Sequence, residues 1–320
     1  MITSQRTVFR KKLNLAASFP MKPRCISVRA VRATCLSLIC LGLSGVAAAA
    51  TVSCKAPSAR EISARPERAA PGSTVMKRIG EAAGPIRDRA IVSEVLQGNV
   101  PSFMNKLVPL TLRGTASTGR AISVTLCVTP EYLAIGNDRD FVRVPLGLPA
   151  AAYLATELGF LLPTTKIVDA IYQQAAVRVA PNPMDPTSQM TTTSYFVAHN
   201  RTVEQQMSGA RGSKDGLSAG HKKDLVLSNR LRAKPGRVAI YGWHRQNGKP
   251  IQPLSTVHGS EYADYSHGVR LVSSIAYVDG NPMTLDQIMR DRELSKLVSS
   301  EGPIEDANGL LRSYARIALN

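Results

Sequence analysis

Histidine and carboxylate side chains gather in the last third of the chain. All five histidines lie between His199 and His267, and residues 240–272 hold three of them together with the only tryptophan. That stretch also contains several glycines and prolines and lies between two segments with strand-like patterns. Loops held by a rigid sheet often carry functional side chains, because the sheet fixes positions that a loop alone cannot fix. We therefore predict a functional site in the loops of residues 221–270.

Four side chains of this stretch are candidate metal ligands, namely His244, His258, Asp264 and His267. Imidazole nitrogen and carboxylate oxygen are common zinc ligands, and a catalytic zinc site has three protein ligands and one open position. Bound zinc lowers the pKa of its water ligand and so supplies hydroxide near neutral pH. Glu261, or Asp264 if it is not a ligand, would then transfer protons. This interpretation predicts zinc as the cofactor and Asp264, His267 and Glu261 as catalytic residues.

The ligand set resembles the His, Asp, His set of zinc peptidases that cut bacterial cell-wall peptides, including the D-alanyl-D-alanine carboxypeptidases. In that family a pattern close to His-x6-Asp precedes Glu-x-Trp-His, whereas here the spacing is His258-x5-Asp264 and Trp243-His244 comes before it. The phrases IYGWH, KPIQPL and DYSHGVRLV also resemble a stretch of exported bacterial proteins of unknown function. The resemblance to the zinc peptidases implies an exported hydrolase that acts on cell-envelope peptide or amide bonds.

A hydrolase without a metal is an alternative that uses the same histidines. Asp264 would orient His267 or His258, which would activate a serine nucleophile. The candidate serines in this stretch are Ser255, Ser260 and Ser266. Residues 216–220 also match the G-x-S-x-G pattern, but they lack the preceding hydrophobic strand and the following helix of a nucleophile elbow. We therefore assign no nucleophilic role to Ser218.

Cationic and aromatic residues near the histidines predict a binding surface. Lys222 and Lys223 could bind a carboxylate or phosphate, and Arg270 could hold the same group through two hydrogen bonds. Trp243 and the neighbouring tyrosines would offer a flat apolar surface to a peptide or sugar. We predict that Trp243, Lys222, Lys223 and Arg270 bind substrate. These residues also support the alternative function, a non-enzymatic envelope protein that binds glycan or peptide.

The first fifty residues have the three-part pattern of an export signal. A basic stretch after Met21 precedes a short apolar run, and four alanines end at Ala50. The apolar run is too short to span a bilayer of about 30 Å, and no later run of about 20 apolar residues occurs, so we predict no transmembrane segment in the mature chain. We expect a leader and signal peptide at 1–50, with translation starting at Met1 or Met21. The mature protein would begin near Thr51 and be periplasmic or secreted.

The charge of the mature chain argues against a nucleic-acid partner. The whole chain has 40 basic and 23 acidic residues, a net charge of +17, but the first fifty residues hold eight of the basic residues and no acidic one. The remainder, with 32 basic residues, carries only +9, and aromatic residues make up 5% of the chain. Cell-envelope peptide or glycan is therefore the predicted partner. Cys54 and Cys127 alone remain after removal of the leader, and export would let them pair or leave two free thiols.

The apolar patterns predict an α+β fold. Residues 51–74 have almost no large apolar side chain, which predicts a flexible linker. Helices are expected in 75–97, with a break at Gly84-Pro85, in 150–162, after Pro163 and from Thr284 to 298. Strands are expected at 108–112, 121–129, 132–135, 140–146, 195–198, 225–227, 237–241 and 269–278. Because strands and helices come in blocks, we predict one α+β domain, 75–320, with a mixed or antiparallel sheet and helices segregated from the strands.

Overall fold

The structure describes two long ranges of the chain and two single residues before them. In the computed structural model these residues are 52, 54, 62–209 and 216–318, and they belong to a unit that spans 48–320. The predicted leader and signal peptide, 1–50, lies outside the described residues. Within the described ranges, no helix combines the length and the apolar character needed to cross a membrane.

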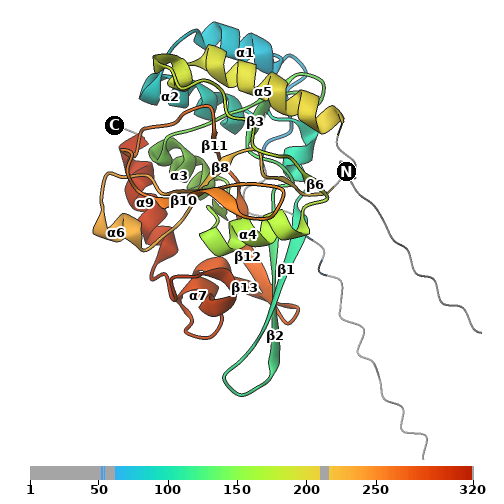
Figure 1. Ribbon diagram of the computed structural model, residues 1–320, viewed down its shortest axis with the longest axis vertical. Coiled ribbons are helices and arrows are strands. Elements are labelled where there is room, and N and C mark those ends of the chain that lie inside the picture. The colour runs from blue at the N-terminus through green and yellow to red at the C-terminus, as the bar shows by residue number, and fades with distance from the viewer. Residues whose placement is uncertain (1–51, 53, 55–61, 210–215, 319–320) are drawn as a thin grey trace, which may run out of the picture. The chain divides into compact units, whose positions relative to one another are not determined.

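The larger sheet is built around a long hairpin. Its main path runs β1 (Val108–Thr115), β2 (Ala121–Val128), β12 (Val272–Val278) and β13 (Asn281–Thr284), and β5 (Phe160–Leu161) pairs with β12. All of these pairs are antiparallel. Figure 1 shows the β1–β2 hairpin extending to the end of this unit opposite α1, α2 and α5. The sequence predicts β1, β2 and β12 from their branched apolar residues, and the structure confirms them.

The smaller sheet carries several of the predicted site residues. Its order is β10 (Pro250–Ser255), β9 (Ile240–His244), β8 (Lys223–Leu225) and β11 (His267–Gly268), with β8 and β11 parallel. The Asn247-Gly248 pair, a dipeptide typical of hairpin turns, lies between β9 and β10. Two further strand pairs are β3 (Ala134–Gly136) with β4 (Phe141–Arg143), and β6 (Val177–Arg178) with β7 (Ser218–Ala219).

The first helices break where the sequence predicts. Helix α1 (Gly72–Ile79) and helix α2 (Gly84–Leu96) are separated near the Gly84-Pro85 dipeptide, and a short 3-10 helix, η1 (Ser102–Asn105), follows. The linker prediction for 51–74 does not hold for residues 62–74, because they pack on the domain. Ile62 is buried, and the Arg65 side chain donates hydrogen bonds to the Asn99 side chain and to the Gly136 carbonyl. These hydrogen bonds hold residues 62–74 on the domain, and a hydrophobicity pattern does not reveal them.

A disulfide bond joins Cys54 to Cys127 of β2, with their Cα atoms 5.4 Å apart. This spacing is ordinary for a disulfide. The pairing that the sequence leaves open is thus present, and it ties the segment that precedes the domain to the larger sheet.

The central helices include one that replaces a predicted strand. Helices α3 (Leu148–Glu157) and α4 (Thr165–Gln174) match predicted helices, and the Thr164 hydroxyl caps α4 by accepting from the Ile167 N–H. The strand predicted at 195–198 is wrong, because these residues lie in helix α5 (Thr193–Ser208), which follows the 3-10 helix η2 (Ser188–Thr191). The buried residues of α5 recur at helical spacing, and the Thr192 hydroxyl caps its first turn. A four-residue window is too short to show this period.

The C-terminal helices close the core beside α3. Helix α6 (Arg230–Ala233) is short, α7 (Leu285–Arg290) begins with the capping box of Thr284 and Gln287, and α8 (Ser295–Val298) follows. Helix α9 (Ala307–Ala318), which the sequence patterns did not predict, packs against α3. Antiparallel and mixed sheets with separate helices confirm the predicted α+β class.

Candidate functional site

The predicted site residues divide into a cluster around His267 and several residues that lie elsewhere. The cluster contains His258, Asp264 and His267 together with Lys223 and Trp243. Strand β11 positions His267, strand β8 positions Lys223, strand β9 positions Trp243, and the connection from β10 to β11 supplies the other two. We call these five residues the His267 cluster.

Asp264 is the best-coordinated member of the His267 cluster. Its Oδ1 accepts hydrogen bonds from the Ser266 N–H at 2.8 Å and from the Ser266 hydroxyl at 2.5 Å. Its Oδ2 accepts from the Tyr262 hydroxyl at 3.2 Å and lies 3.8 Å from His267 Nε2. Burial alone would raise the pKa of Asp264, but His267, Ser266 and Lys223 outweigh burial and lower it. The hydroxyl of Ser266 therefore serves the carboxylate rather than a histidine.

The His267 ring is buried with its two nitrogens free of hydrogen bonds. The residue is fully buried, and neither Nδ1 nor Nε2 has a hydrogen-bond partner among the described residues. Burial is the main cause that lowers the pKa of His267 to about 4, although Asp264 opposes it. The imidazole is neutral at pH 7 and therefore has a lone pair able to accept a proton. Buried polar groups are normally hydrogen-bonded. Several other residues of the described chain have one buried side-chain atom without a partner, but His267 has two.

A stacked pair of rings covers His267. The His258 ring stacks on the Tyr262 ring with centroids 4.1 Å apart, and Tyr262 meets the His267 ring edge-on at 5.6 Å. The His258 and His267 rings are 6.5 Å apart. Both covering residues are half-buried, whereas His267 has no exposed surface. The covering pair thus separates His267 from the surface.

Lys223 lies beside His267, and Trp243 lies beside Lys223. Lys223 is the register partner of His267 in the parallel pairing of β8 and β11. Its ammonium lies 4.9 Å from the centre of a Trp243 ring, within the range of cation–π attraction. Trp243 has φ of 57°, a left-handed conformation that is costly for a bulky residue. Strain of this kind is often found at binding and catalytic sites.

His244 does not join the other three predicted zinc ligands. Its Nε2 lies 2.8 Å from Asp169 Oδ1, and its ring stacks on Tyr172 at 4.6 Å. Helix α4, which carries both of these partners, holds His244 away from the His267 cluster. Across the described part of the chain, no three His, Cys, Asp or Glu side chains are grouped as a metal site requires. The residues as they stand do not fit the predicted zinc site.

Lys222 and Arg270 are buried and do not form the predicted anion clamp. Lys222 Nζ donates to the Tyr265 carbonyl and lies 3.1 Å from His199 Nδ1. Arg270 donates to the carbonyls of Thr129 and Ser218. Lys222 is buried among these partners, whereas Lys223 is half-buried at the start of β8. Of the predicted cationic residues, Lys223 is the one that pairs in register with His267 and is only half-buried.

A second buried polar group, which sequence reasoning missed, surrounds Glu131. Its carboxylate accepts hydrogen bonds from the side chains of Arg143 at 2.9 Å and Ser218 at 2.8 Å, and lies 2.9 Å from His221 Nε2. Burial would raise the pKa of Glu131, but Arg143 and His221 outweigh it and hold the pKa well below its usual range. In the sequence, Glu131 is a single glutamate just after a predicted strand of branched residues. This position does not indicate that Arg143, Ser218 and His221 are its partners.

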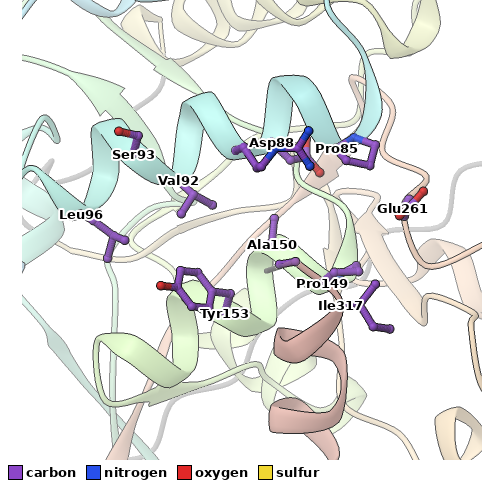
Figure 2. Close-up of a pocket in the computed structure, with 12 residues that line it drawn as sticks. Pro85, Asp88, Val92, Ser93, Leu96, Pro149, Ala150, Tyr153, Glu261 and Ile317 are labelled. Atoms are coloured by element: carbon purple, nitrogen blue, oxygen red, sulfur yellow. The ribbon is translucent and has the colours of Figure 1, made fainter. Parts of the chain in front are cut away.

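Two of the sequence-predicted residues have other surroundings. Ser218, the serine of the G-x-S-x-G match, lies on the two-residue strand β7 and donates to Glu131, so the elbow geometry is absent there. Glu261, predicted as a proton-transfer residue, is exposed and lines a separate cavity with residues of α2, α3 and α9 (Figure 2). The structure therefore gives Glu261 a place outside the His267 cluster.

The His267 cluster can perform acid–base chemistry beside a positive charge. It combines a neutral imidazole, a carboxylate that can orient it and an ammonium next to an aromatic surface. Comparisons of the chain with protein-family models, with curated proteins and with solved structures found no match.

Proposed function

We propose that the protein is an exported hydrolase that cleaves peptide or amide bonds of the cell envelope, with His267 as general base. The single observation that carries the proposal is the buried His267 ring, whose nitrogens have no hydrogen-bond partner among the described residues while Asp264 lies 3.8 Å away. A neutral imidazole beside a carboxylate is a common general base. Export is inferred from the N-terminal sequence pattern.

The proposed reaction uses water as the nucleophile. His267 accepts a proton from water while the oxygen bonds to the carbonyl carbon of the substrate. Asp264 stabilises the imidazolium that forms, because opposite charges attract strongly in a buried site. The bond from carbon to nitrogen then breaks, and the imidazolium returns the proton to the leaving nitrogen. The products are a carboxylic acid and an amine, and no redox step is needed.

Lys223 and Trp243 account for substrate binding in this proposal. The Lys223 ammonium would bind the negative oxygen of the reacting carbonyl or a carboxylate of the substrate. The Trp243 ring would contact an apolar part of the substrate. A peptide with a free carboxylate and short apolar side chains offers both features, which is why cell-envelope peptides are the proposed class.

Substrate access requires movement of the rings of His258 and Tyr262. His267 has no exposed surface, and these two stacked rings are its half-buried cover. Enzymes often close such covers over the substrate to exclude water from the reacting atoms. We therefore assign a gating role to His258 and Tyr262 and no direct chemical role.

The test is peptide-bond cleavage by the mature chain from Thr51. Purified peptidoglycan sacculi and their peptide fragments are incubated with protein, and newly released amino groups are measured. We expect His267→Asn to lose at least about 100-fold in rate, the usual contribution of a general base. His244→Gln is the matched control, because His244 is a buried histidine outside the His267 cluster. Equal rates for wild type and His267→Asn would refute the assignment of the base.

Metal content provides a second check of the same site. Zinc is measured in the wild type and in the double variant Asp264→Ala with His267→Ala, each after incubation with excess zinc. About one zinc per chain, lost in the double variant, would overturn the metal-free mechanism and restore the zinc hypothesis. No zinc in either protein would support His267 as a base.

A binding function without catalysis is the second candidate. It is favoured by the contact of Lys223 with Trp243 and by the left-handed backbone of Trp243. If no fragment is cleaved, binding of the same fragments is measured by calorimetry. Loss of binding in Lys223→Met, with binding retained in His267→Asn, would establish this function in place of hydrolysis.

A further inference from the structure

A cavity of about 390 Å³ lies between helices α2, α3 and α9, outside the His267 cluster. Figure 2 shows side chains of these three helices and Glu261 pointing toward this space. Cavities of about 300–1,000 Å³ are typical of small-molecule sites. The volume therefore suits a small organic ligand rather than a polymer.

The walls of the cavity are mainly apolar. Val92 and Leu96 lie on α2, Ala150 and Tyr153 on α3, and Ile317 on α9. Ile317 is 43% exposed, which is high for a large apolar side chain on a packed helix. A ligand with an apolar chain or ring would cover this exposed apolar surface, which is favourable at about 25 cal/mol per Å².

Carboxylates lie toward one end of the cavity. In Figure 2, Asp88 and Glu261 lie on the side opposite Leu96 and Tyr153. The negative charge of Asp88 already has partners, because its carboxylate accepts hydrogen bonds from the Arg87 guanidinium at 2.8 and 2.9 Å and from the Gly147 N–H at 2.8 Å. Glu261 is exposed, and no described residue forms a hydrogen bond or an ion pair with its carboxylate. Glu261 is thus the negative group that remains for a ligand.

We propose that this cavity binds a small organic cation with an apolar body, such as an alkyl or aryl ammonium compound. The ammonium would pair with Glu261, and the apolar body would lie between Val92, Tyr153 and Ile317. Arg89 also lines the cavity, but its side chain is exposed and forms no ion pair with Glu261 in the described structure. The site is independent of the proposed hydrolase, since it shares no residue with the His267 cluster.

The test compares three ligands of equal chain length, octylammonium, octanol and octanoate, by calorimetry with the mature chain at pH 7. We expect octylammonium to bind most tightly and octanoate most weakly. Glu261→Gln should weaken octylammonium binding about fivefold, the limit for a partly exposed ion pair, and leave octanol binding unchanged. Glu305→Gln is the matched control, because Glu305 is an exposed glutamate two residues before α9, and the first residue of that helix, Ala307, is about 15 Å from Ile317 along the helix axis.

A blocking variant separates this cavity from other apolar surfaces. Val92→Trp places a large side chain into the cavity from a half-buried position, so it should abolish binding of octylammonium and octanol alike. Circular dichroism confirms that the variant folds. Equal affinity for the three ligands, no binding by the wild type, or unchanged binding by Val92→Trp would each overturn the proposal.

Discussion

The buried side chains of Glu131 and His267 differ in how completely their own polar atoms are paired. Glu131 receives hydrogen bonds from the Arg143 and Ser218 side chains and from the Tyr132 N–H, and it lies 2.9 Å from His221. The ring nitrogens of His267 have no hydrogen-bond partner among the described residues. Such a carboxylate is suited to a structural role, because its hydrogen-bond partners would lose bonds if it were protonated. An imidazole without hydrogen bonds keeps a lone pair that can accept a proton.

The first and largest test of this comparison removes the charge of Glu131. Glu131→Gln leaves the buried Arg143 guanidinium without its main counter-ion, so the free energy of unfolding should fall by about 3–5 kcal/mol. Chemical denaturation measures the change. Glu204→Gln is the matched control, since Glu204 also pairs with Arg143 but its side chain is 45% exposed, and it should cost at most about 1 kcal/mol. Equal costs for both variants would show that the Glu131 group is not the structural one.

In the second test, a change at His267 is expected to affect cleavage much more than stability. Replacing this histidine by asparagine breaks no side-chain hydrogen bond, so the free energy of unfolding should change by only about 1 kcal/mol while cleavage falls at least 100-fold. His221→Asn is the contrasting variant, because it removes a hydrogen-bond partner of buried Glu131 and should cost more stability, about 1–3 kcal/mol. A larger stability loss in His267→Asn than in His221→Asn would break the comparison.

The third test uses pH. The unfolded chain protonates His267 near the usual pKa of 6.5, but the folded protein does so only near about 4. The unfolded state therefore binds more protons between these values, and the contribution of His267 to stability is lost as the pH falls through that window. His199, whose pKa burial lowers to about 2, acts in the same direction, whereas Asp224, whose pKa is raised to about 6, acts in the opposite one.

The total slope thus mixes several groups, but the difference between wild type and His267→Asn isolates one of them. Denaturation of both proteins at several values between pH 4 and pH 6.5 should show a steeper loss of stability for the wild type as the pH falls. Parallel curves would mean that His267 is as easily protonated in the folded protein as in the unfolded one. That result would remove the basis for a buried neutral base.

The smallest expected effect concerns the cover of His267. Tyr262→Phe keeps the ring that lies over His267 but removes the hydrogen bond to Asp264 Oδ2, so it should lower the free energy of unfolding by about 0.5–1.5 kcal/mol. Tyr262→Ala removes the ring as well and should expose His267 to solvent. Histidine proton resonances, followed by NMR during a pH titration, should then show a higher pKa for His267 in Tyr262→Ala than in Tyr262→Phe.

Much of the fold was predictable because it depends on local patterns. Branched apolar residues identified β1 and β2, the Gly84-Pro85 break separated α1 from α2, and Thr284 marked the start of α7. The predicted strand at 195–198 was wrong because these four residues are β-like in type and too few to show the 3.6-residue period of α5. Helix α9 escaped prediction although its buried residues recur at helical spacing on the face toward α3.

The site was predictable only in part. The density of histidines and the lone tryptophan led to the stretch that carries His267, Asp264 and Trp243, in which Asp264 lies 3.8 Å from His267 and Trp243 contacts Lys223. The same reasoning grouped His244 with them, whereas Asp169 and Tyr172 of α4 hold it elsewhere. It also assigned Lys222 and Lys223 to one anion site, whereas Lys222 is buried and donates to the Tyr265 carbonyl. Nearness in sequence does not specify the direction in which a side chain points.

By itself, the sequence determined the α+β class and the residue types available for chemistry, because these follow from composition and from short-range periodicity. The tertiary structure decided which of these side chains meet. Glu131 meets Ser218 and His221, which lie 87 and 90 residues later in the chain, and the pairing of β8 with β11 places Lys223 beside His267. Burial and hydrogen bonding, which determine whether a group is a structural partner or a free base, depend on those long-range contacts and are not written in any local pattern.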